Sequence, residues 1–64
     1  MVAYKYHYNV MITGINKGIK KRFPTRASDY MKKRIAEYAQ EQLDAGHDIE
    51  ANKYILELYY GKST

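Results

Sequence analysis

The chain has 64 residues and a formal net charge of +4, with eight tyrosines and no cysteine. This length predicts one domain, residues 1–64, and the lack of cysteine excludes disulfides, thiol catalysis and zinc–thiolate sites and favours a reducing compartment. No apolar run is long enough to cross a membrane, and residues 1–5 lack the layout of a signal peptide, so we expect a cytoplasmic protein.

The segment Tyr4–Thr13 alternates between two faces and predicts a strand. One face carries Tyr4, Tyr6, Tyr8, Val10 and Ile12. The following Asn16-Lys17-Gly18 is typical of a turn that closes a β-hairpin. We expect the chain to return as a short edge strand over residues 19–23, which Pro24 ends.

Signals for a helix follow Pro24. Thr25 or Ser28 can serve as its N-cap, and Gly46 is placed to end it. Between them apolar residues recur at steps of three and four, which predicts an amphipathic helix packed on a sheet. These residues are Ala27, Met31, Ile35, Tyr38, Ala39 and Leu43.

A third strand is predicted over residues 53–60, with Tyr54, Leu56, Leu58 and Tyr60 toward the helix. The resulting fold class is α+β: a three-stranded antiparallel sheet in spatial order 2-1-3, with one helix packed on one face. The other sheet face would be open and would carry Met11, Ile55 and Tyr59. It is either an ordinary solvated face or a contact surface for a partner or a second copy.

Positive charge is concentrated in one segment. Eight of the eleven basic residues lie between Lys17 and Arg34 and are opposed by Asp29 alone, which leaves this segment at +7. In the expected fold they gather at one end, where a basic patch attracts polyanions, although lysine-rich surfaces also serve solubility alone. The predicted partner-binding residues are Lys17, Lys20, Lys21, Arg22, Arg26, Lys32, Lys33 and Arg34.

Residues for catalysis are not evident. Ser28 is explained as a helix cap and His7 as a sheet residue, and no nucleophile is paired with a base. The acidic residues and the imidazole between Asp44 and Glu50 match no known metal-binding loop. We therefore expect no enzyme activity, no metal and no cofactor.

The leading hypothesis is a non-catalytic module, monomeric or homodimeric, that binds nucleic acid through the basic segment. One alternative is a small regulator or inhibitor that docks its basic end, or an edge strand, on an acidic protein. Another is a dimeric assembly subunit that pairs through the open sheet face. The basic hairpin followed by a helix is similar in topology to the arm-binding domains of tyrosine recombinases. The size and element order are similar to those of small phage-encoded inhibitors of host polymerases.

Overall fold

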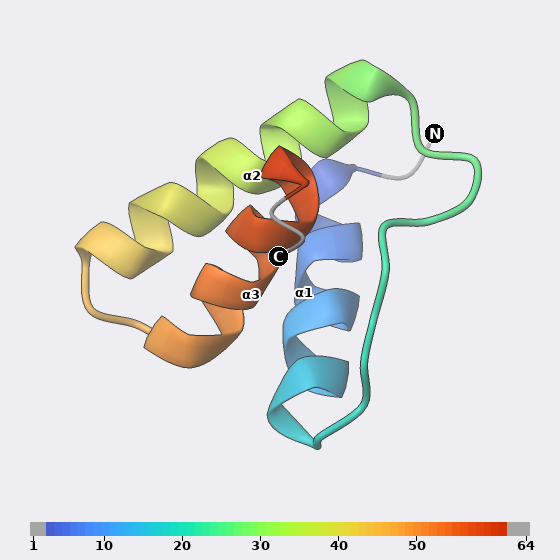
Figure 1. Ribbon diagram of the computed structural model, residues 1–64. Coiled ribbons are helices and arrows are strands. Elements are labelled where there is room, and N and C mark those ends of the chain that lie inside the picture. The colour runs from blue at the N-terminus through green and yellow to red at the C-terminus, as the bar shows by residue number, and fades with distance from the viewer. Residues whose placement is uncertain (1–2, 62–64) are drawn as a thin grey trace.

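The computed structural model describes residues 3–61 and contains, within them, three helices and no strand (Figure 1). Helix α1 spans Tyr4–Asn16, α2 spans Asp29–Asp44 and α3 spans Ile49–Tyr60. Helix α2 packs against both other helices, most extensively against α3. The linker of residues 17–28 returns along α1 to the start of α2. The predicted α+β fold is therefore wrong, and the two resemblances that depended on its strand order lose their basis.

The segment predicted as the first strand is helix α1, because its apolar residues also follow a helical period. One face of α1 carries Tyr4, Tyr8, Met11, Ile12 and Ile15, which form or adjoin the hydrophobic core. A strand would have buried Tyr6 and Val10 on that same face, yet they are 59% and 41% exposed. The same residues fit both periods, and burial against two other helices favours the helix.

The Asn-Lys-Gly sequence predicted as a hairpin turn ends α1 instead. Gly18 has a φ of 85°; its N–H donates to the carbonyl of Ile15 and the N–H of Ile19 to that of Gly14, both at 2.9 Å. This pair of bonds is a Schellman motif, in which a left-handed glycine follows the helix C-terminus. Residues 19–23, predicted as the returning strand, have no regular secondary structure.

The helix predicted to begin at Thr25 or Ser28 and to end at Gly46 is confirmed, but it packs on two helices and not on the predicted sheet. The Ser28 hydroxyl accepts a hydrogen bond from the N–H of Met31 at 3.1 Å, so Ser28 is the N-cap. Gly46 has a φ of 80° and ends the helix in a second Schellman motif. Ile35 and Ala39 are fully buried, as the helical period predicted.

The segment predicted as the third strand is helix α3. Ile55, predicted to face outward, is fully buried, whereas Tyr60, predicted to face inward, is 69% exposed. A helix turns by about 100° per residue, so Ala51 and Ile55 share the buried face. The predicted open sheet face does not form: Met11 and Ile55 lie in the core, and Tyr59 alone of its three residues keeps partial exposure.

A buried polar contact joins α1 to the start of α3. Asn52 is fully buried, and its Oδ1 accepts a hydrogen bond from the Tyr8 hydroxyl at 2.6 Å. Its Nδ2 donates to the carbonyls of His47 and Asp48, at 2.7 and 3.1 Å. Burial raises the pKa of the Tyr8 hydroxyl, while the hydrogen bond to Asn52 acts in the opposite direction. The contact therefore holds the α2–α3 turn against α1.

Candidate functional site

The eight cations predicted to bind a partner lie on the linker and at the beginning of α2. Lys17 directly follows α1, and Lys20, Arg22 and Arg26 are exposed along the linker. The linker that carries these cations runs from the end of α1 back toward its start and does not form one hairpin end (Figure 1). The prediction that the cations gather at the end of a hairpin is therefore wrong, because residues 3–61 form no hairpin.

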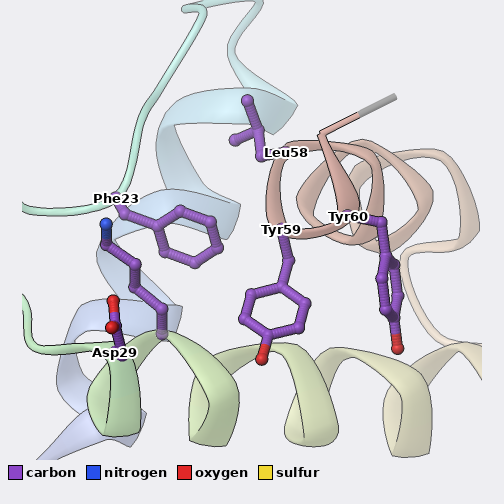
Figure 2. Close-up of a pocket in the computed structure, with 6 residues that line it drawn as sticks. Phe23, Asp29, Leu58, Tyr59 and Tyr60 are labelled. Atoms are coloured by element: carbon purple, nitrogen blue, oxygen red, sulfur yellow. The ribbon is translucent and has the colours of Figure 1, made fainter. Parts of the chain in front are cut away.

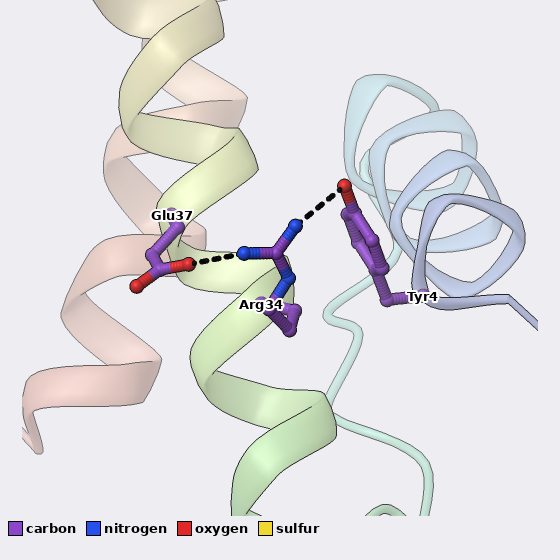
Figure 3. A network of polar contacts seen from close by, with 3 residues as sticks. All are labelled: Tyr4, Arg34 and Glu37. Atoms are coloured by element: carbon purple, nitrogen blue, oxygen red, sulfur yellow. Dashed lines mark hydrogen bonds and ion pairs between the residues drawn. The ribbon is translucent and has the colours of Figure 1, made fainter.

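Arg34 differs from the other cations because its guanidinium is engaged within the protein (Figure 3). Its Nη1 lies 3.0 Å from a carboxylate oxygen of Glu37, and its Nη2 donates to the Tyr4 hydroxyl at 3.3 Å. The guanidinium carbon is 4.9 Å from the centroid of the Tyr4 ring, within the range of a cation–π contact. The hydrogen bond to Tyr4 is the main influence that raises the pKa of Arg34. Arg34 therefore links α2 to α1, and its guanidinium is already engaged by Glu37 and Tyr4.

Lys21 combines a structural contact with its charge. Its methylene groups cover the buried Gly14 of α1 so closely that a methyl group there would lie 2.6 Å from Lys21 Cε. A long cationic side chain can cover a neighbour with its stem while its ammonium group stays in water. Lys21 thus holds the linker against α1.

The remaining cations of the segment have no acidic partner in residues 3–61, where the contact between Arg34 and Glu37 is the one ion pair. Most acidic residues occupy the second half of α2, the turn and α3. The charges are therefore separated along the chain. We call the unpaired set the basic strip: Lys17, Lys20, Lys21, Arg22, Arg26, Lys32 and Lys33.

Lys32 and Lys33 of the basic strip also line a groove that the strand prediction concealed, and Figure 2 shows part of it. Two hollows of about 490 and 390 Å³ lie between α2 and the end of α3, and Tyr59 and Tyr60 line both. Lys32 lines the first hollow and Lys33 the second, while Phe23 extends from the linker into the first. We call this surface the aromatic groove: these five residues line it together with Asp29, Ala36, Glu37, Gln40 and Leu58.

The rings of the aromatic groove are arranged edge to face. Tyr59 and Tyr60 both extend from α3 toward α2 (Figure 2), with ring centroids 5.1 Å apart and planes at 76°. Phe23 meets Tyr59 at 6.4 Å, again nearly perpendicular. A prediction of helix over this segment, with Ile55 in the core, would have placed Tyr60 on the surface beside Tyr59, because the helical period turns Tyr60 away from the core.

Other kinds of site find little support in the described part of the chain. Within residues 3–61 no three imidazole and carboxylate side chains are placed to hold a metal ion, including those between Asp44 and Glu50. No helix in this range is long and apolar enough to cross a bilayer. Comparison with protein-family models, curated proteins and solved structures finds no match, so the basic strip and the aromatic groove alone are the basis for a function.

Proposed function

We propose that this protein binds nucleic acid through the basic strip. The observation that carries the proposal is a run of seven cations without an acidic partner among the described residues. Phosphates are bound through such charges without regard to base sequence. Arg22 and Arg26 are suited to bidentate phosphate contacts, whereas the lysines act as point charges.

The strip has a cost to the fold, which argues for a role beyond solubility. Like charges repel one another, and a concentration of unpaired cations destabilises the compact state. Neutralising Lys20 or Arg22 would relieve this repulsion without disturbing the core, because both are exposed on the linker. A polyanionic ligand in a reducing, cytoplasmic compartment would neutralise these charges and relieve the repulsion.

Two of the alternatives depended on strands and are not proposed again. Residues 3–61 contain no strand, so no described edge is open to strand addition. A dimer through a sheet face is removed by the burial of Met11 and Ile55. Docking on an acidic protein remains as an outcome of the experiment below.

The test compares two double variants that remove the same charge. Lys20→Gln with Arg22→Gln alters the strip, whereas Lys5→Gln with Lys53→Gln alters α1 and α3 outside it. Lys21 is left in place because its stem packs on Gly14. Fluorescence anisotropy of labelled single- and double-stranded DNA and RNA is measured between about 50 and 200 mM salt.

We expect affinity to fall linearly with salt on logarithmic axes. The strip variant should bind more weakly. Its slope of log affinity against log salt concentration should be shallower by roughly 1.4–1.8, since each of the two lost phosphate contacts accounts for about 0.7–0.9. The control variant should keep the wild-type slope. Absence of binding at low salt, or equal losses in both variants, would refute the strip as a nucleic-acid site. An acidic protein captured in its place would then support the docking alternative.

A further inference from the structure

We infer that the aromatic groove stacks an unpaired base, and that the ligand is therefore single-stranded nucleic acid. This inference rests on the proposed function and names the class of nucleic acid that the same surface takes. It is carried by one juxtaposition: Tyr60, 69% exposed, lies beside the ring of Tyr59 where Lys32 and Lys33 also line the groove.

The ring of Tyr60 is available to a ligand. Its exposure places it outside the hydrophobic core, so its contribution to folding is small. The ring of Tyr59 meets that of Tyr60 at 76°. This contact already restricts the Tyr60 side chain, so less conformational entropy is lost when a ligand binds. Aromatic side chains on which bases stack are the usual means of holding single strands without sequence preference.

The size and surroundings of the groove suit one nucleotide. The larger hollow, about 490 Å³, lies within the range of roughly 300–1,000 Å³ that is typical of sites for small molecules. Each hollow is lined by one lysine, so a strand that places a base against Tyr60 has a cation for its phosphate in either hollow. Lys32 and Lys33 belong to both the groove and the basic strip, and Phe23 directly follows Arg22 in the chain.

The two acidic residues in the groove reduce this attraction but do not cancel it, because Lys32, Lys33 and Arg34 outnumber them. Asp29 and Glu37 also line the hollows, but Glu37 is already paired with Arg34. Asp29 lies in the first turn of α2, where the positive end of the helix dipole favours a carboxylate. A carboxylate can also accept a hydrogen bond from the exocyclic amino group of a base, so its presence is compatible with this ligand.

Charge opposes the duplex alternative. Helices α2 and α3 are joined by the short turn 45–48 with Gly46, an arrangement that suggests a helix-turn-helix. In that mode the N-terminal residues of the second helix enter the major groove. Here that end carries Asp48 and Glu50, which repel phosphates, and Lys53 is the sole cation of α3. Stacking on Tyr60 also requires an unpaired base.

The experiment measures anisotropy of a labelled single strand of about 12 nucleotides, within the usual range of site sizes, and of its duplex. Tyr60→Leu removes the ring from the groove, and Tyr60→Phe keeps it. Tyr6→Leu is the matched control, because Tyr6 is 59% exposed but lies on α1 and does not line the groove. Thermal unfolding followed by circular dichroism verifies that each variant is folded.

We expect the wild type to prefer the single strand. Tyr60→Leu should weaken that binding roughly 5- to 150-fold, the equivalent of one lost stacking contact, with an unchanged salt slope because no phosphate contact is lost. Tyr60→Phe and Tyr6→Leu should bind as the wild type does. Preference for duplex, or wild-type affinity in Tyr60→Leu, would overturn this inference while the salt slope and the Lys20/Arg22 variant still supported nucleic-acid binding. No binding of any nucleic acid would overturn both.

Discussion

Replacing Tyr8 with phenylalanine removes one hydroxyl from the core and leaves Oδ1 of Asn52 without its hydrogen bond. The bond is 2.6 Å long, Tyr8 is 4% exposed and Asn52 is fully buried. A buried acceptor left unpaired costs about 1–3 kcal/mol. A domain of 64 residues has an unfolding free energy of only about 3–10 kcal/mol. We therefore expect Tyr8→Phe to remove a large part of the stability.

The free energy of unfolding is measured in urea, where a shifted midpoint with an unchanged slope reports a change in stability alone. A loss of about 2 kcal/mol corresponds to a thermal midpoint lower by roughly 8–16 °C for a domain of this size. Tyr60→Phe is the matched control: it deletes the same hydroxyl from a ring that is 69% exposed, and should stay within about 0.5 kcal/mol of wild type.

A double-mutant cycle with Asn52→Leu separates the hydrogen bond from general effects of the substitution. If the contact between Tyr8 and Asn52 stabilises the fold as described, Tyr8→Phe should cost less in the Asn52→Leu background, with a coupling of about 0.5–3 kcal/mol. An equal cost in both backgrounds would refute this account of the core. So would a loss below about 0.5 kcal/mol in the wild-type background.

Two further predictions concern pH and the start of α2. The pKa of Tyr8 is raised above its ordinary value of 10.0, chiefly by burial, so the folded state holds this proton longer than the unfolded state. Its stabilising effect is complete below about pH 10 and is lost as pH rises through the folded pKa, so the difference in urea midpoint between wild type and Tyr8→Phe should stay constant up to about pH 10 and narrow at higher pH. Ser28→Ala should lower the unfolding free energy by about 0.5–2 kcal/mol, because it removes the N-cap bond. Thr25→Ala should have little effect in the same urea titration, and an equal loss in both variants would contradict the assignment of the cap.

Helix α2 could be predicted from the sequence because independent local signals agree on it. Ser28 caps it, apolar residues recur with a helical period, and Gly46 ends it. Helix α1 lacks such agreement: its N-cap is Ala3, which has no side-chain oxygen to accept a hydrogen bond, and its first turn has no acidic residue. With weak end signals, the alternation of tyrosine and branched residues favoured a strand.

The candidate site was predicted in part. The concentration of cations between Lys17 and Arg34 is a property of the chain and holds in any fold. Whether each cation is unpaired depends on its neighbours in space. Arg34 is not part of the unpaired set, because the fold places its guanidinium between Glu37 and Tyr4. The faces of α1 and α3 follow from the period of the backbone, so the wrong period placed Met11 and Ile55 on the surface.

By itself the sequence determined the position of α2, the separation of charge along the chain, and the absence of thiol chemistry. These depend on residue identities and on contacts within a few positions. Tertiary structure decided the rest. The segments that form α1 and α3 satisfy periods of 2 and 3.6 almost equally well. Which secondary structure forms is therefore decided by which face of the segment can be buried against the other elements. The aromatic groove exists because α3 ends beside α2 and the linker, which brings Phe23, Lys32 and Tyr60 together from distant parts of the chain.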